Sequence, residues 1–134
     1  MKSILVLEDE PCVMTLLRLV LVGAGYSVAT CAEQAERFAQ LDGCISLLIA
    51  DVTAPCSGIA VSGQLKTSMP LLKFVLTSGY PVTMWSYQDT ALYDALPTDS
   101  VRVLLKPFRP IDILAAVRSL IGSSADATRC ATVG

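Results

Sequence analysis

Short runs of consecutive apolar residues constrain the fold of this chain more than any other feature of its sequence. Residues 4–7, 47–49 and 103–105 are apolar at every position, without alternating polar residues. Strands have this pattern when helices cover both faces of their sheet, as in parallel sheets. The predicted strands are Ser3–Leu7, Tyr26–Thr30, Ser46–Ala50, Lys73–Leu76 and Val101–Leu105.

Segments with helical spacing of apolar residues separate these strands. The predicted helices cover residues 13–21, Ala32–Leu41, Ile59–Thr67 and a segment that begins at Pro110, a favoured first-turn residue. The stretch Pro81–Asp99 holds prolines with β-branched and aromatic residues, and it predicts an irregular or short fourth helix. Strands that alternate with helices predict an α/β fold, a doubly wound parallel sheet with helices on both faces.

The length and composition indicate one folded domain. The chain has 134 residues, of which 53% are hydrophobic and 16% are charged, so disorder is not expected. We predict a domain over residues 1–122 and a polar tail over residues 123–134, and the Met1 start with this tail favours a stand-alone protein. A net charge of −2 without a basic cluster argues against nucleic-acid binding, and no apolar run is long enough to span a membrane.

The cysteine and histidine content excludes several kinds of chemistry. An odd number of cysteines without CxxC spacing predicts reduced thiols in a cytoplasmic protein, with neither a disulfide framework nor a zinc site; they are Cys12, Cys31, Cys44, Cys56 and Cys130. The absence of histidine excludes histidine-based catalysis and phosphorylation on histidine within the chain.

Polar residues follow the carboxyl ends of four predicted strands, the edge at which open parallel sheets bind ligands. They are Glu8, Asp9 and Glu10 after the first strand, Asp51 after the third, Thr77 at the fourth and Lys106 at the fifth. Crowded carboxylates raise each other's pKa unless a cation lies among them, and a set of oxygen ligands favours Mg²⁺. The acids after the first strand could instead only favour a helix start, and this is all that we expect of Glu10.

These residue types suit phosphoryl transfer to an aspartate. A carboxylate that attacks phosphorus forms an acyl phosphate, and the reaction depends on neutralising the charge of the phosphoryl oxygens. Mg²⁺ and Lys106 would supply positive charge, and the hydroxyl of Thr77 would supply a hydrogen bond. The sequence therefore predicts Asp51 as the acceptor of a phosphoryl group.

Four segments, "ILVLEDE", "LLIADVTAP", "VLTSGY" and "LLKPF", resemble in order the signatures of response-regulator receiver domains, over residues 3–121. The resemblance implies a flavodoxin-like sheet in the order 2-1-3-4-5 and a role in a two-component phosphorelay. It implies that Asp51 is phosphorylated and helps to hold Mg²⁺. Asp9 would bind the ion directly, Glu8 through water, and the backbone carbonyl of Thr53 would be a third ligand.

The resemblance also implies roles for Lys106, which would bridge the phosphoryl group to the acids, and for Thr77, which would move to bond it. The Lys106–Pro107 bond is often cis in such proteins. A sensor histidine kinase or a histidine phosphotransferase would donate the phosphoryl group. The readout would be contact with another protein, including a homodimer through the fourth helix, fifth strand and fifth helix.

Several positions depart from the family pattern. Glu8 stands where an aspartate is commoner, and the segment from Pro55 to Gly58 is shorter than usual. Val103 lies where many members carry an aromatic switch residue. These departures keep a second hypothesis open, a pseudo-receiver that binds a partner without turning over phosphate. The cluster of Met84, Trp85, Tyr87 and Tyr93 is either an exposed partner patch or core packing.

Enzymes on the same architecture fit less well. A flavin-binding protein needs a phosphate loop rich in Ser, Thr and Gly after the first strand, where this chain has acids and Pro11. A dehalogenase-like phosphatase needs a second aspartate two residues after its nucleophile, and Pro11 occupies that position after Asp9.

Overall fold

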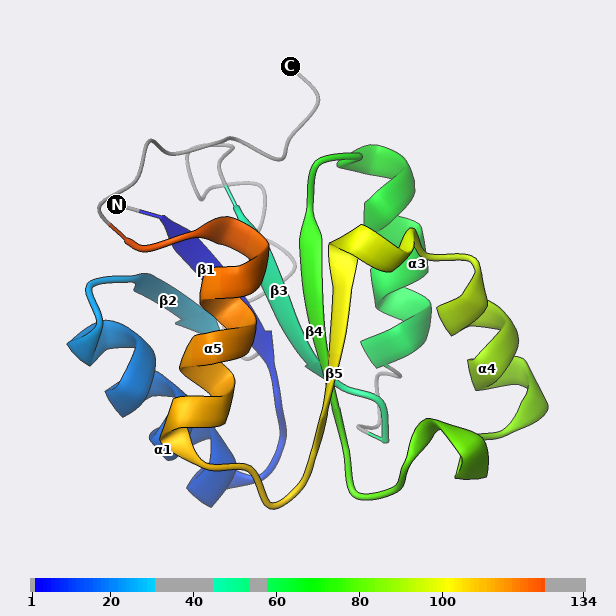
Figure 1. Cartoon of the computed structure of the whole chain (residues 1–134), viewed down its shortest axis with the longest axis horizontal. Helices are drawn as coiled ribbons and strands as arrows, with labels where there is room; N and C mark the ends of the chain where they lie inside the picture. The colour runs from blue at the N-terminus through cyan, green and yellow to red at the C-terminus, as the bar shows by residue number, and fades with distance from the viewer. Residues whose placement is uncertain (1, 31–44, 54–57, 125–134) are drawn as a thin grey trace.

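A five-stranded parallel sheet forms the centre of the protein in the computed structural model, which describes residues 2–30, 45–53 and 58–124 (Figure 1). The strands lie in the order β2-β1-β3-β4-β5, and every neighbouring pair is parallel. Their bounds are β1 Ser3–Leu7, β2 Ser27–Thr30, β3 Leu47–Asp51, β4 Lys73–Ser78 and β5 Val101–Leu105. The predicted doubly wound, flavodoxin-like fold is confirmed.

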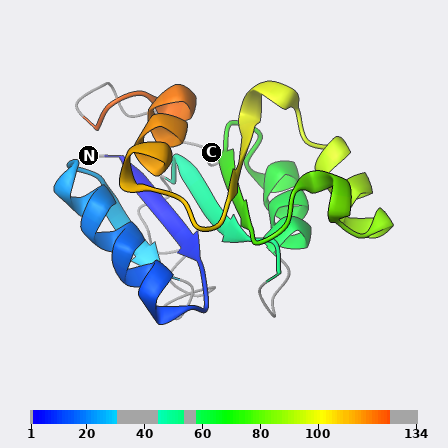
Figure 2. The same cartoon turned by 60° about the horizontal axis from the view of Figure 1, so that its bottom comes forward.

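Helices cover both faces of this sheet, as Figures 1 and 2 show from two directions. The described helices are α1 Pro11–Gly23, α3 Gly58–Ser68, α4 Tyr87–Asp94 and α5 Pro110–Ile121, with short 3-10 helices η2 Val82–Met84 and η3 Thr98–Ser100. Both α1 and α5 begin with proline, whose fixed φ suits the first helical position. The expected short fourth helix is confirmed, and the helix predicted over residues 32–41 lies outside the described residues.

The core consists of two apolar layers because successive strand residues point to opposite faces of the sheet. On one face, Ile4 and Val6 of β1 pack with Leu17 of α1 and Ile113 of α5. On the other face, Leu5 and Leu7 pack in the layer that includes Ile59 of α3 and Phe74 of β4. Continuous apolar strands therefore fill both layers, which explains why these strands do not alternate with polar residues.

Strands β3 and β4 extend beyond their predicted ends, and β2 and β3 each begin one residue later than predicted. Asp51 is the last residue of β3 and pairs in register with Thr77, which lies inside β4. The pairing of β3 with β4 includes one further hydrogen bond, in which the amide of Val52 donates to the carbonyl of Thr77 at 2.9 Å. Tyr26 is not part of β2, since its amide bonds the carbonyl of Leu21 at the end of α1.

The described helices are all too short or too polar to cross a lipid bilayer.

Leu17 and Leu19 offer a matched test of this core because both belong to α1. The side chain of Leu17 is fully buried between α1 and the sheet, whereas Leu19 is 69% exposed. We expect Leu17→Ala to lower the free energy of unfolding by about 2–5 kcal/mol, through lost contacts and a cavity. Leu19→Ala should change it by less than about 0.5 kcal/mol. Urea denaturation monitored by circular dichroism measures both, and equal losses would contradict the packing of α1.

Candidate functional site

The carboxyl ends of β1 and β3 place three acidic side chains at one edge of the sheet. Glu8 and Asp9 directly follow β1, and Asp51 ends the neighbouring strand β3. Carboxylate oxygens of these three residues all lie within 4.8 Å of one another. The chain runs from β1 outward to β2 on one side and from β3 to β4 on the other, so this is the switch point in strand order.

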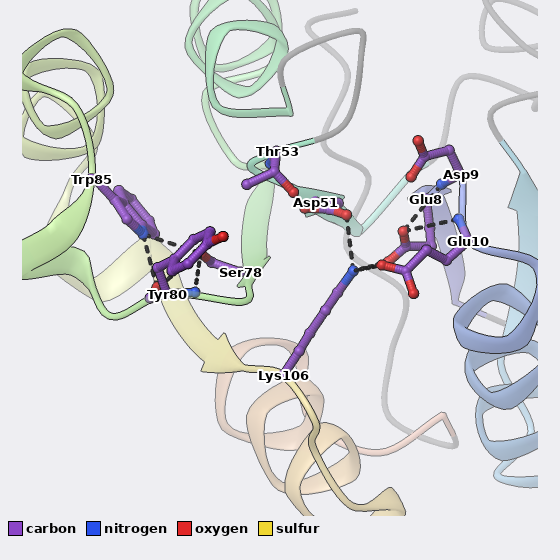
Figure 3. A network of polar contacts seen from close by, with 9 residues as sticks. All are labelled: Glu8, Asp9, Glu10, Asp51, Thr53, Ser78, Tyr80, Trp85 and Lys106. Atoms are coloured by element: carbon purple, nitrogen blue, oxygen red, sulfur yellow. Dashed lines mark hydrogen bonds and ion pairs between the residues drawn. The ribbon is translucent and has the colours of Figure 1, made fainter.

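Lys106 directly follows β5, and its side chain faces this acidic cluster (Figure 3). Its ammonium nitrogen is 2.9 Å from Asp51 Oδ2 and 2.9 Å from Glu8 Oε1. The backbone amide of Lys106 donates to the carbonyl of Ser78 at 2.8 Å, which holds the start of the following loop against β4. The peptide bond between Lys106 and Pro107 is cis, as the resemblance implied.

Glu8 and Glu10 differ from the roles predicted for helix-start acids. The buried carboxylate of Glu8 accepts the amides of Asp9 and Glu10 at 3.1 and 3.2 Å, so it orders the loop before α1. Glu10 is the N-cap residue of α1, but its side chain makes no capping bond. Its carboxylate instead lies 3.3 Å from the ammonium of Lys106, so the prediction that Glu10 only starts the helix is wrong.

Asp51 is fixed from both sides and is only 2% exposed. Its Oδ1 accepts the amide and the hydroxyl of Thr53 at 2.9 and 2.8 Å, while its Oδ2 accepts the ammonium of Lys106. A Cβ at Gly58 would lie 2.6 Å from the carbonyl oxygen of Asp51, so only glycine lets α3 begin this close to β3. Sequence reasoning did not assign a role to Gly58. The role of the Thr53 carbonyl as a metal ligand stays a prediction.

Burial and charge shift the pKa values of these groups in different directions. Burial raises the pKa of Glu8 above its usual value, although the ammonium of Lys106 and the amide of Glu10 act against it. Burial also acts to raise the pKa of Asp51, but hydrogen bonds from Lys106 and Thr53 outweigh it and lower that pKa. The pKa of Lys106 is raised because its bonds to both carboxylates outweigh the effect of burial. Asp51 is therefore an ionised carboxylate at neutral pH.

The charges of this cluster fit a divalent cation. Glu8, Asp9 and Asp51 bring three carboxylates together against the single ammonium of Lys106. Burial is the main cause of the raised pKa of Glu8, and the negative charge of Asp51 adds to it. All of the side-chain ligands are carboxylate oxygens, the donors that Mg²⁺ and Ca²⁺ prefer. The residues present therefore fit the Mg²⁺ ion that the sequence predicted, held by Glu8, Asp9 and Asp51.

Thr77 and Ser78 stand at the end of β4 beside Asp51. Both are buried, and within the described part of the chain the hydroxyl of Thr77 has no hydrogen-bond partner. Ser78 was not predicted as a functional residue, but its hydroxyl is bonded to Tyr80 and Trp85. Only its position after Thr77 could have indicated it in the sequence.

The cluster of Met84, Trp85, Tyr87 and Tyr93 after β4 is partly packed on the core and partly exposed. Trp85 and Tyr93 pack against the core, with their rings edge to face at 5.5 Å. Met84 and Tyr87 are among the most exposed large apolar side chains. Both alternatives left open by the sequence thus apply, each to half of the cluster. Cys12 is exposed at the start of α1, and the other cysteines lie outside the described residues.

The fold is similar to that of several solved response regulators and receiver domains. The chain matches the signal receiver domain of an HD domain-containing protein from Pseudomonas fluorescens Pf-5 with a TM-score of 0.72 at 19% identity, covering 89% of this chain and 93% of that one. It matches the response regulator TrrA from Thermotoga maritima, crystallised with Mg²⁺-BeF, with a TM-score of 0.67 at 28% identity, covering 90% and 99% of the two chains.

Among curated proteins, the alginate biosynthesis transcriptional regulatory protein AlgB from Pseudomonas aeruginosa is 34% identical over 121 residues. The match covers 87% of this chain but only 25% of AlgB, so the chain spans about a quarter of that relative. No protein-family model matches the chain. In fold and in the arrangement of the site at the sheet edge, the chain is similar to the receiver domains of two-component response regulators.

Replacing Lys106 tests the electrostatic role of its ammonium. Lys106→Met keeps an unbranched side chain but leaves Glu8 and Asp51 buried without their counter-charge. We expect it to lower the free energy of unfolding by about 3 kcal/mol near pH 8, in the range for breaking a buried ion pair. Chemical denaturation at several pH values without divalent cations measures this loss.

The loss should shrink as the pH falls. The folded-state pKa of Glu8 already lies above its unfolded value, so the fold favours its neutral form, and removing Lys106 raises this pKa further. The variant therefore takes up protons at a higher pH than the wild type and recovers stability toward about pH 5. Arg109→Met breaks the exposed ion pair to Asp112 instead and should behave like the wild type. A loss that is independent of pH would contradict the assigned charges.

Proposed function

We propose that this receiver domain accepts a phosphoryl group on Asp51 in a Mg²⁺-dependent reaction and signals through contacts with other proteins. The observation that carries the proposal is the convergence of an ionised, hydrogen-bonded Asp51, a neighbouring acid cluster and the ammonium of Lys106 at one sheet edge. The Mg²⁺-BeF complex of the similar regulator TrrA supports it, because that protein binds both components.

In this mechanism a carboxylate oxygen of Asp51 attacks the phosphorus of a phosphohistidine on the donor. A bond forms between that oxygen and phosphorus while the bond between phosphorus and the imidazole nitrogen breaks, and the imidazole takes up a proton. Mg²⁺, held by Glu8, Asp9, Asp51 and the carbonyl of Thr53, would neutralise charge on the phosphoryl oxygens. The chain's own task is to position Asp51, and the two bonds from Thr53 do this.

Access to Asp51 requires Lys106 to move, because Asp51 is buried and Lys106 lies against it. The lysine side chain is flexible, and its charge can pass from the carboxylates to the oxygens of an arriving phosphoryl group. The hydroxyl of Thr77, which has no partner among the described residues, can then donate to another of these oxygens. Lys106 would thus exchange a carboxylate for a phosphoryl oxygen, and Thr77 would gain a first partner for its hydroxyl.

A hollow beside Lys106 supports an approach of the donor along α1. Its volume is about 400 Å³, and Val13 and Leu16 of α1 and Phe108 after β5 line it, with Glu10 and Lys106 at its charged edge. We infer that the donor is a sensor histidine kinase or a histidine phosphotransferase that docks over this hollow. Such a donor would place the reaction in the cytoplasm.

The output surface that we propose is the face of α4, β5 and α5. Exposed apolar side chains on these elements support it, among them Tyr87, Leu105 and Ile111. This face would contact a partner protein or a second copy of the chain. We place the signalling domain in residues 1–122.

Phosphorylation of Asp51 can be tested directly. We expect the purified chain to gain the mass of one phosphoryl group on incubation with acetyl phosphate and Mg²⁺, and to gain none with EDTA. Asp51→Asn should abolish the gain because it removes the nucleophile. Asp94→Asn changes an exposed acid at the end of α4 and should react like the wild type. A gain that survives in Asp51→Asn, measured by intact-protein mass spectrometry, would defeat the assignment.

A second function, binding a partner without phosphate turnover, is favoured by one observation. Lys106 already neutralises Asp51, which is almost inaccessible. An interaction module of this kind has no need for a divalent ion. Mg²⁺ binding therefore separates the two functions.

Mg²⁺ should stabilise the protein against thermal unfolding in a concentration-dependent manner if Asp51 is an acceptor. Asp9→Asn should weaken this stabilisation by about tenfold or more in Mg²⁺ concentration, since it removes an exposed carboxylate ligand without disturbing Lys106. Asp94→Asn again serves as the matched control. Differential scanning fluorimetry across a Mg²⁺ titration measures the effect, and an unchanged melting temperature at every concentration would favour the interaction module.

A further inference from the structure

The hydroxyl of Ser78 organises the segment that follows β4. It donates to the carbonyl of Tyr80 at 2.8 Å and accepts the amide of Tyr80 at 3.0 Å. It also accepts the indole N–H of Trp85 at 3.2 Å, and this N–H lies 3.1 Å from the carbonyl of Tyr80 as well (Figure 3). The indole is thus tied to the end of β4 through two acceptors, one of them on a fully buried residue adjacent to Thr77.

The ring of Trp85 links this point to α4. It packs against the core layer on the α3 side of the sheet, and its ring meets Tyr93 of α4 at an interplanar angle of 76°. None of the residues of α4 is fully buried, and only Leu92 and Tyr93 of this helix pack partly on the core. α4 therefore packs mainly against α3 and reaches the sheet side of the core through few side chains, and Trp85 supplies one contact there that includes directed hydrogen bonds.

The neighbouring strand β5 offers no comparable link. Its residues opposite the end of β4 are Val103, Leu104 and Leu105, which pair with Leu76, Thr77 and Ser78. Aliphatic side chains form no hydrogen bonds, so a change at Thr77 cannot pass to α4 through polar contacts of these side chains. Trp85, the only tryptophan of the chain, instead donates a hydrogen bond from its indole N–H to Ser78 at the end of β4.

We propose that Trp85 is a positioning residue that couples the state of Asp51 to the position of α4, an inference that rests on the proposed function. A phosphoryl oxygen on Asp51 is an acceptor for the hydroxyl of Thr77, which has no partner within the described residues. Movement of Thr77 toward Asp51 displaces the adjacent Ser78. The indole N–H then loses one of its two acceptors, and α4 is held less firmly on the sheet.

The test uses the whole chain labelled with 5-fluorotryptophan, so that its single fluorine signal reports on Trp85. Mg²⁺ with beryllofluoride serves as the phosphoryl probe, and the probe's own bound ¹⁹F signals report its binding independently. We expect beryllofluoride to move the tryptophan signal beyond the shift given by Mg²⁺ alone. Hydrogen exchange over residues 86–94 should become about fivefold faster, the effect of losing one neutral hydrogen bond.

Two variants separate the effect of the hydrogen bond between Trp85 and Ser78 from the effect of the packing of the Trp85 ring. Trp85→Phe keeps an aromatic ring but lacks the N–H, so exchange over residues 86–94 should already be fast and should change little on addition of beryllofluoride. Ser78→Ala keeps the tryptophan, and its ¹⁹F signal should lie near the bound position before the probe is added. Tyr87→Phe, at a position 93% exposed on α4, should respond like the wild type.

The outcomes separate this proposal from the proposed function. If beryllofluoride binds and the exchange of α4 responds in both Trp85→Phe and Ser78→Ala as it does in the wild type, the coupling role of Trp85 is overturned. If the wild type shows no bound ¹⁹F signals of beryllofluoride, the acceptor function fails and the coupling fails with it. Loss of the folded state in Trp85→Phe, seen by circular dichroism, leaves the decision to Ser78→Ala.

Discussion

The ammonium of Lys106 between Asp51 and Glu8 is the interaction on which the rest of the site depends. It lies 2.9 Å from each carboxylate, and without it two buried acids would face each other with no counter-charge. One ammonium cannot balance the three carboxylates of Glu8, Asp9 and Asp51. The site therefore has an excess of negative charge, which fits a divalent cation such as Mg²⁺.

The contacts that stabilise the carboxylate of Asp51 also shield it from a reaction partner. The bonds from Thr53 and Lys106 that lower the pKa of Asp51 also bury it, so the carboxylate is ionised but shielded. Under the proposed function, a phosphoryl group would replace this ion pair, because its oxygens carry the negative charge that Lys106 would otherwise lose. In a phosphoryl acceptor Lys106 must leave Asp51, whereas in a module that only binds partners this ion pair can remain.

The helices differ in how many fully buried residues they contribute to the core. α1 and α5 place fully buried residues such as Leu17 and Ile113 against one face, whereas α4 has none. Under the proposed coupling, a change at the end of β4 would reach α4 through Trp85, and α4 would shift more readily than α5 because it has no fully buried residue.

The fold and the composition of the site were predictable from the sequence because apolar runs fix strands, and parallel strands bring their carboxyl ends to one edge. Four strand ends with acids, a hydroxyl and an ammonium therefore identified Glu8, Asp9, Asp51, Thr77 and Lys106 as neighbours. Only the tertiary structure decided the partners: Glu10 contacts Lys106, Gly58 admits α3 beside Asp51, and Ser78 binds Trp85. Such contacts depend on the angles and depths at which separate elements meet, and residue spacing along one element carries no information about them.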